Sequence, residues 1–256
     1  DDTLQEMVDN GELAGVVTML ARHGKVAFVD VAGVRDIESK QPMTRDSIFR
    51  IQSMTKPITG VAMMMLYEEG RWRLNDPVSR YILEFEQLKV YTGENSDGSI
   101  QQEELDRPIM MRELMTHTAG LSYTLDMRHS VNRMFRDQRV LNPREPLQTM
   151  IDKMAMLPLL AQPGTRWIYS SAVDVQSYLV EKLSGQTFAE FLDERIFGPL
   201  EMGDTAFYVP ASELGRVAAR HRLDAQGVLE RLSGREPLTV MPQGPTGGAG
   251  LYSTAD

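Results

Sequence analysis

The hydrophobic positions of the first 67 residues predict a hairpin, a short strand and a buried helix. Residues 15–22 and 25–31 are rich in Val and Ala and flank His23-Gly24, which suits a tight turn between antiparallel strands. A polar loop then leads to a short strand over residues 47–50. From Ile58 to Leu66 the side chains leave no polar side, which is typical of a helix surrounded by protein. These elements predict an antiparallel sheet with a helix packed on it.

After residue 67 the pattern changes to short helices interrupted by Pro and Gly. Residues 93–102, rich in Gly, Ser and Asn, are expected to form a mobile excursion. Residues 218–232 return to hairpin geometry. We therefore predict a discontinuous sheet domain, residues 1–67 and 216–256, with a helical domain, residues 68–215, inserted in it. The expected helices of the inserted domain cover residues 110–115, 126–140, 148–157 and 172–184, and a further one opens with a capping box at Thr187.

Ser53 and Lys56 stand three residues apart at the start of the predicted buried helix. On a helix both side chains leave the same face and can touch. A helix N-terminus carries partial positive charge, and a lysine partly withdrawn from water prefers its neutral form, which accepts a proton. The alternative is that Ser53 caps an ordinary core helix and Lys56 is a solvated lysine. A Ser-x-x-Lys pattern alone does not decide between the two.

A second candidate lies more than a hundred residues later, in the loop over residues 162–171. One interpretation makes Ser171 or Ser170 the N-cap of the helix that follows, with Asp174 at a capping-box spacing from Ser171 and Tyr169 packed by its ring. The functional interpretation points the Tyr169 hydroxyl at Ser53 and Lys56. A tyrosine beside a cationic lysine favours phenolate, so the three groups would share one proton without a histidine.

Composition excludes several classes of function. The 256 residues include 27 basic and 36 acidic ones, a net charge of −9, which argues against a nucleic-acid partner. There is no apolar run near the roughly 20 residues of a membrane span. The absence of cysteine excludes disulfides and thiol catalysis, and four scattered histidines lack a metal-ligand spacing, so we expect neither a metal nor a cofactor. His117 is expected to bond nearby loop backbone.

The two ends of the sequence suggest a fragment. The chain begins at Asp1, and it ends after Ser253-Thr254-Ala255-Asp256, which is typical of the opening of a helix. We therefore expect that part of the protein is missing. A cytoplasmic location is expected, with a periplasmic or secreted one open if a signal peptide has been removed. The oligomeric state is not in the sequence.

Two of these motifs point to a known family. Ser53-Met54-Thr55-Lys56 followed by Tyr169-Ser170-Ser171 resembles the first two active-site motifs of the serine β-lactamase and penicillin-binding-protein superfamily, nearest to class C β-lactamases and family VIII carboxylesterases. Residues 114–121, 162–164 and 247–253 are also similar to this group. The resemblance implies a β-lactamase-like α/β (α+β) fold, an antiparallel sheet flanked by helices with an inserted helical domain and the active site in the cleft between them.

The resemblance also implies roles for individual residues. Ser53 would be the acyl-accepting nucleophile, Lys56 its proton partner, and Tyr169 the base that also protonates the leaving group. For substrate contacts it implies Tyr123, since related esterases often have aromatic residues there; a surface tyrosine is the alternative. Gly248, in a glycine-rich run, would let backbone approach the substrate closely, or would only belong to a loop.

Two departures from the family pattern matter. Class C β-lactamases have asparagine where this chain has Ser171, and a shorter hydroxyl weakens recognition of an amide, which favours esters. The third motif, a Lys-Thr-Gly or Trp-Gly-Gly-like strand, is not in the sequence and is expected beyond Asp256. That strand would supply one oxyanion-hole N–H and Ser53 the other, so these residues alone are not expected to be active.

The function that these motifs favour is hydrolysis of short-chain carboxylic esters, which are small-molecule substrates, through an acyl-serine intermediate. A β-lactamase, a D-amino-acid peptidase or an acyltransferase of the same superfamily remains an alternative. So does a sensor or binding module that is acylated once and not released. A purely structural helical protein would require Ser53 and Tyr169 to lie far apart.

Overall fold

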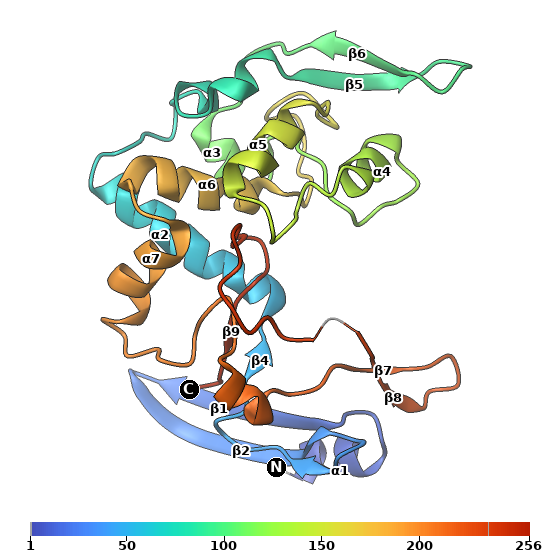
Figure 1. Cartoon of the computed structure of the whole chain (residues 1–256), viewed down its shortest axis with the longest axis vertical. Helices are drawn as coiled ribbons and strands as arrows, with labels where there is room; N and C mark the ends of the chain where they lie inside the picture. Colours follow the sequence, from blue (N-terminus) through green and yellow to red (C-terminus); the bar gives the residue numbers. More distant parts are fainter. Residues whose placement is uncertain (1, 235) are drawn as a thin grey trace. The chain divides into compact units, whose positions relative to one another are not determined.

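The computed structural model describes residues 2–234 and 236–256. It divides into two compact units (Figure 1), the first formed by Asp1–Ile51, Met202–Met241 and Leu251–Asp256 and the second by Gln52–Glu201 and Pro242–Gly250. Residues 1 and 235, which fall in the predicted sheet domain, lie outside the described residues. Both units combine helices with short antiparallel sheets, and the predicted β-lactamase-like α/β (α+β) fold is confirmed by the solved structures reported below.

The first unit contains the predicted N-terminal hairpin. Helix α1 (Asp2–Asp9) precedes β1 (Gly15–Arg22) and β2 (Lys25–Asp36), which pair antiparallel, and β3 (Gln41–Pro42) adds to the other edge of β2. At the turn, His23 and Gly24 both have positive φ, of 52° and 71°, the conformation that matches the twist of a two-residue hairpin. The hairpin is confirmed, and β2 runs five residues further than predicted.

The rest of the first unit brings distant segments together. Strand β4 (Phe49–Arg50) pairs with β9 (Tyr252–Ser253), and Ile48, Val209 and Tyr252 pack beside this pair. The 3₁₀-helix η5 (Ala211–Arg216) is followed by the hairpin of β7 (His221–Leu223) and β8 (Leu229–Arg231), as the sequence predicts.

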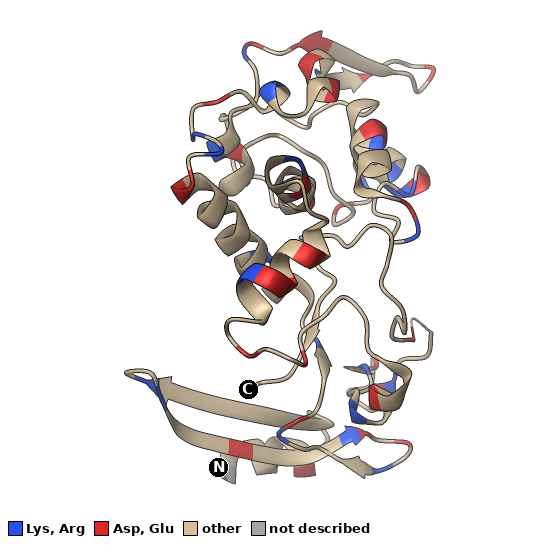
Figure 2. Ribbon diagram, turned by 60° about the vertical axis from the view of Figure 1, so that its left-hand side comes forward, with Lys and Arg blue, Asp and Glu red and all other residues tan. Residues whose placement is uncertain are grey.

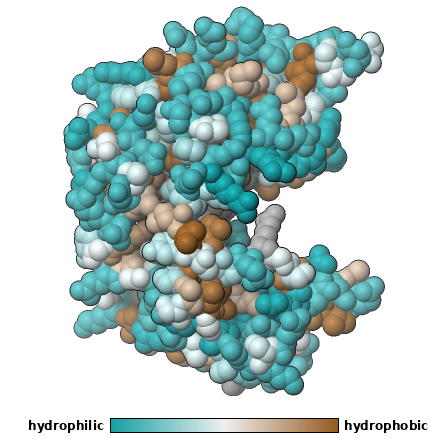
Figure 3. Space-filling view, in the orientation of Figure 1, coloured by the Kyte–Doolittle hydropathy of each residue, from teal (hydrophilic) through white to brown (hydrophobic). Residues whose placement is uncertain are grey.

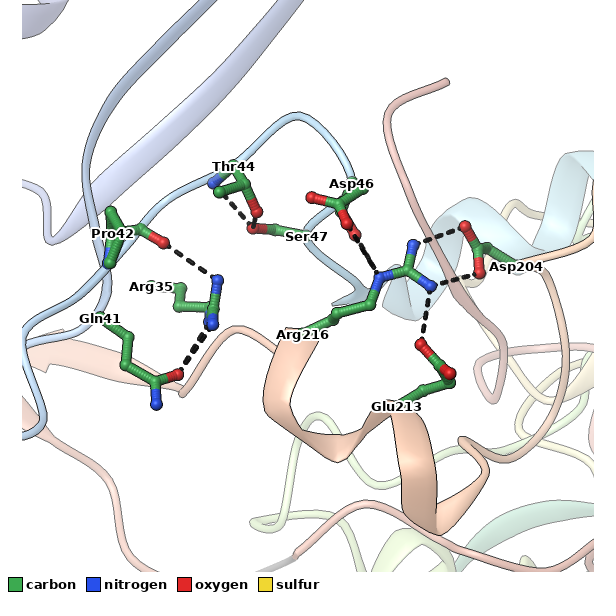
Figure 4. Close-up of polar contacts among 9 residues, drawn as sticks. All are labelled: Arg35, Gln41, Pro42, Thr44, Asp46, Ser47, Asp204, Glu213 and Arg216. Atoms are coloured by element: carbon green, nitrogen blue, oxygen red, sulfur yellow. Dashed lines mark hydrogen bonds and ion pairs between the residues drawn. The ribbon is translucent and has the colours of Figure 1, made fainter.

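Arg216 links three segments of this unit. Its guanidinium contacts Asp46, Asp204 and Glu213, with nitrogen–oxygen distances of 3.2, 2.6 and 3.0 Å (Figure 4). The hydrogen bonds that Arg216 donates to Asp204 raise the pKa of Arg216 above its ordinary value against the effect of burial. Because one planar cation meets three carboxylates, the network fixes the chain before β4 against η5.

The second unit is mainly helical and is centred on two helices. Helix α2 (Thr55–Glu68), preceded by the 3₁₀ turn η1 (Gln52–Met54), packs against α6 (Ala172–Ser184), as Figure 1 shows. Gly185, with φ of 79°, ends α6 in the left-handed conformation. The remaining elements are η2 (Val78–Arg80), η3 (Leu83–Gln87), α3 (Met111–Met115), α4 (Ser130–Asp137), α5 (Leu147–Ala155), α7 (Phe188–Leu192) and the π-helical turn η4 (Asp193–Phe197).

The predicted helices of this unit are confirmed, and α6 matches its predicted bounds. The capping box that opens α7 is also present: the Thr187 hydroxyl accepts from the Glu190 N–H, and the Glu190 carboxylate accepts from the Thr187 N–H. The mobility expected for residues 93–102 stays a prediction, but the segment is not a plain loop. Its ends belong to a hairpin of β5 (Lys89–Glu94) and β6 (Ile100–Glu104), whose polar residues form the turn.

The burial of α2 differs from the prediction. Five of its 14 residues are buried, while Val61 and Met64 are 51% and 39% exposed, so one side of α2 is not covered by packed residues. In α6, by contrast, every residue from Ala172 to Val180 is buried, so its first turns have no open side. The polar residues of α6 hide its burial from a hydropathy pattern, because they are buried with hydrogen bonds to groups within the protein. Gln176, for example, donates to the Leu114 carbonyl at 2.9 Å.

The charged residues of α2 lie only near the two ends of the helix. The charged residues of α2 are Lys56 near its start and Glu68 at its end, and the ribbon between them is tan in Figure 2. Figure 3 shows hydrophobic side chains as brown areas on a face that is otherwise mainly hydrophilic. Among the described residues, no helix combines the length and apolar character needed to cross a bilayer.

Gly120→Ala is expected to destabilise the protein strongly. Gly120 has φ of 80°, and a Cβ there would lie 2.2 Å from the Ala161 backbone oxygen. The combined strain and clash should lower the free energy of unfolding by about 3 kcal/mol or more. Gly185→Ala is the matched control: φ is 79° but nothing lies within 4 Å of the added Cβ, so about 1–2 kcal/mol is expected. Urea denaturation measures both, and equal losses would contradict the role given to Ala161.

Candidate active site

The side chains of Ser53, Lys56 and Tyr169 meet at the start of α2. The Ser53 Oγ lies 2.8 Å from the Tyr169 hydroxyl, and the Lys56 Nζ donates to the same Oγ at 3.1 Å. Ser53 lies in the 3₁₀ turn directly before α2, while Lys56 is in the first turn of that helix. The structure thus brings the three predicted catalytic side chains within hydrogen-bonding distance. It contradicts the interpretation that needed Ser53 and Tyr169 to lie apart.

The surroundings of Tyr169 favour loss of its proton. Partial burial would raise the pKa of the phenol, but hydrogen bonds from Lys56 and Ser53 and the Lys56 charge outweigh it, so the pKa lies below its ordinary value of 10. The Lys56 Nζ also lies 4.8 Å from the centre of the Tyr169 ring. A phenolate at this place is within reach of the Ser53 proton, which is the geometry a general base needs.

Lys56 is partly buried and held on two sides. Besides its bond to Ser53, its Nζ donates to the Gly248 carbonyl at 2.5 Å. Gly248 belongs to a segment, residues 247–250, that we call the glycine strap. Thr59 on α2 donates to the Gly247 carbonyl at 2.9 Å, and the Gly250 N–H donates to the Thr55 hydroxyl at 3.2 Å. The strap therefore lies along α2 and fixes the lysine from the far side.

His117 supports the tyrosine without touching Ser53. Its Nδ1 accepts from the Ser170 N–H at 3.2 Å, and its ring stacks on Tyr169 with 5.0 Å between ring centres. Burial and the Lys56 charge lower the pKa of His117, which favours the neutral ring that can accept this bond. The expectation that His117 bonds nearby loop backbone is confirmed.

The three predicted substrate contacts lie close to this group in different ways. Tyr123 is half-buried, with its ring 6.0 Å from that of Tyr169 and 6.0 Å from the Lys56 Nζ. Ser171 is fully buried, and its hydroxyl donates to the Ser122 carbonyl at 2.9 Å. Gly248 presents its carbonyl to Lys56 rather than to open space. Contact of these residues with a substrate stays a prediction.

The capping-box interpretation of Ser171 and Asp174 is wrong. Ser171 occupies the N-cap position of α6, but its side chain makes no capping bond because it is bonded to Ser122 instead. Asp174 is buried completely and accepts from the Gly248 N–H at 3.0 Å. Sequence reasoning missed this contact, because no pattern local to Asp174 signals a partner 74 residues later.

Metal ligands have no obvious place near this site. Within residues 2–234 and 236–256, no group of three or more His, Cys, Asp or Glu side chains is arranged to hold a metal ion. The polar groups at Ser53 are a hydroxyl, an amine and a phenol. These groups can pass a proton among themselves and form an ester bond at the serine.

Comparison with known proteins gives this geometry a context. A family model described as Beta-lactamase matches residues 1–256. An uncharacterized protein of Mycobacterium tuberculosis is 37% identical over 255 residues, which cover 99% of this chain and 62% of that protein. Esterase EstB of Burkholderia gladioli is 31% identical over 277 residues, covering 100% of this chain and 66% of EstB.

A solved structure shows the same fold. EstCE1, described as a hydrolase with promiscuous acyltransferase activity, is similar with a TM-score of 0.81 and 29% identity, over 100% of this chain and 68% of EstCE1. The chain spans 62% and 66% of the lengths of the two curated relatives named above. The resemblance inferred from the Ser53 and Tyr169 motifs is thereby confirmed at the level of family and fold.

Proposed function

Because the chain belongs to the β-lactamase family, we propose that the full-length protein is a serine carboxylesterase that forms an acyl-enzyme on Ser53. The observation that carries the proposal is the 2.8 Å contact between the Ser53 Oγ and the Tyr169 hydroxyl, with Lys56 bonded to the same oxygen. The similarity to an esterase, EstB, and to the hydrolase EstCE1 supports ester chemistry.

In each half of the proposed reaction Tyr169 first takes a proton and then returns it. Tyr169, as phenolate, takes the Ser53 proton while Oγ attacks the ester carbonyl, and the Ser53 N–H at the start of α2 donates to the oxyanion. Tyr169 then returns the proton to the leaving alcohol. In the second half a water molecule loses its proton to Tyr169 and attacks the acyl-serine, and Ser53 leaves with that proton. Lys56 holds Ser53 and favours the phenolate throughout.

Short acyl chains are the proposed substrates. A serine side chain has no amide group to bind the side chain of a β-lactam, and the buried Ser171 hydroxyl already donates to the Ser122 carbonyl. This contact favours esters over amides. Acyl transfer to an alcohol is the second candidate, favoured by the similarity to EstCE1, a hydrolase with promiscuous acyltransferase activity.

The test is turnover of a series of p-nitrophenyl esters by the full-length protein. We expect p-nitrophenyl acetate and butyrate to be hydrolysed faster than long-chain esters, and nitrocefin to be hydrolysed far more slowly. Added alcohol distinguishes the second candidate, because a transferase forms the new ester faster than the free acid. A protein that turns over nitrocefin but none of the esters would overturn the proposal.

A further inference from the structure

Asp174 is a buried titratable group beside the candidate site that the reaction above leaves unused. It lies in the first turn of α6 with none of its surface exposed. Its Oδ1 accepts from the Gly248 N–H at 3.0 Å, while Oδ2 has no hydrogen-bonding partner among the residues that the structure describes. A carboxylate in such a place is costly compared with an apolar residue, so its presence beside a candidate active site calls for a role.

One residue of the glycine strap connects Asp174 to Lys56. Gly248 gives its N–H to Asp174 and its carbonyl to the Lys56 Nζ. The fit is tight, because a Cβ at residue 248 would lie 2.5 and 2.6 Å from the two carboxylate oxygens. Asp174 therefore helps to fix the Gly248 peptide, alongside the bonds of Gly247 and Gly250 to α2, and the Gly248 carbonyl is an acceptor that holds the lysine.

We propose that Asp174 is a positioning residue for the reaction at Ser53: through Gly248 it holds the Lys56 amine against the serine, and its negative charge acts on Tyr169. The proposal rests on the proposed function for its kinetic part. Its electrostatic part concerns the ionisation of Tyr169 and can be measured without any substrate.

The charges of Asp174 and Lys56 have opposite effects on the pKa of the Tyr169 phenol. Burial raises the pKa of Asp174 to about 6, against the lowering effects of the Gly248 N–H and of Lys56, so the carboxylate is ionised above neutral pH. At Tyr169 the Lys56 charge lowers the pKa and the Asp174 charge raises it. Asp174 also raises the pKa of Tyr123, after the larger effect of burial. Removing the charge at residue 174 should therefore move the Tyr169 ionisation to lower pH.

Two substitutions separate position from charge. Asp174→Asn keeps an oxygen for the Gly248 N–H but removes the charge, so the Tyr169 phenolate should form at lower pH, and the acid limb of kcat/KM should move with it. Asp174→Ala removes the acceptor as well. The Gly248 peptide then loses this bond and can shift, and kcat should fall by about 100-fold with a smaller change in KM, as expected when a reacting group is displaced by an ångström.

Ultraviolet titration of the phenolate is the direct measurement, with Tyr169→Phe subtracted to isolate Tyr169. Gln176→Leu is the matched control, since it removes a buried hydrogen bond from the same helix to the Leu114 carbonyl. It should lower the melting temperature and leave the Tyr169 titration in place. If Asp174→Ala does not fold, the ultraviolet titration of Tyr169 in Asp174→Asn still tests the proposal.

The outcomes distinguish the two claims. A shifted Tyr169 titration in Asp174→Asn without ester turnover by the wild type would support the electrostatic role and overturn the proposed function. Turnover by the wild type with an unshifted titration and acid limb in Asp174→Asn would overturn the role of the Asp174 charge. An Asp174→Ala variant that folds and keeps the wild-type kcat would overturn its role in positioning Lys56.

Discussion

Ser53→Ala is expected to lower kcat/KM for p-nitrophenyl butyrate by on the order of 10⁴-fold or more, because a nucleophile and its base act as a unit. Both Tyr169 and Lys56 contact the Ser53 Oγ, at 2.8 and 3.1 Å. Removing it leaves the base without a proton to take and the ester without an attacking oxygen. Initial rates with the full-length protein at saturating and subsaturating ester measure the loss.

The neighbouring Ser170 supplies the control for this prediction. Its hydroxyl is buried and lies 3.4 Å from the His117 Nδ1, and the backbone N–H, which alanine retains, makes the closer bond to that ring at 3.2 Å. Ser170→Ala should therefore keep most of the activity. A Ser53→Ala protein that hydrolyses the ester as fast as Ser170→Ala would refute the assignment of the nucleophile.

Lys56→Met should be nearly as damaging and should also change the pH dependence. Methionine fills a similar volume but offers no donor to Ser53 or to the Gly248 carbonyl, so we expect a loss of about 10³-fold in kcat/KM at neutral pH. Lys56 is also what lowers the pKa of Tyr169 against the effect of burial. Without it the pKa rises, the phenolate forms at higher pH, and the residual activity should increase towards alkaline pH.

A pH profile of kcat/KM for the variant and the wild type checks the second part of this prediction, since that profile reports the ionisations of the free enzyme. The acid limb should lie at higher pH in Lys56→Met. Lys182→Met is a suitable control, because this lysine lies over the ring of Tyr178 on α6 rather than at Ser53. An acid limb at the wild-type position in Lys56→Met would contradict the role of Lys56 in lowering the pKa of Tyr169.

Local sequence patterns predicted the features that are formed by residues close together in the sequence. Ser53 and Lys56 touch because they are three residues apart at the start of α2, a distance that any helix imposes. The hairpin at His23-Gly24 and the capping box at Thr187 are local in the same sense. Tyr169 was identified through its motif, and its contact with Ser53 needed the resemblance to a known family.

Contacts between distant segments were beyond these patterns. No sequence pattern near Asp174 shows that its carboxylate accepts a hydrogen bond from the Gly248 N–H, 74 residues later. The capping-box spacing suggested Ser171 as its partner, yet the Ser171 hydroxyl is taken by the Ser122 carbonyl from another loop. Likewise the polar residues 93–102 look irregular in isolation, but strand pairing between β5 and β6 orders them. The predicted domain boundaries at residues 67 and 216 stay a prediction.

The central claim is that Ser53 carries the acyl group during turnover. Mass spectrometry of peptides from full-length protein that is acid-quenched while hydrolysing p-nitrophenyl butyrate tests this claim most directly. We expect a butyryl adduct on the peptide that contains Ser53. This adduct should be absent in Ser53→Ala and reduced in Lys56→Met. Turnover accompanied by an adduct on a different residue, or by none under conditions where deacylation is slowed, would contradict it.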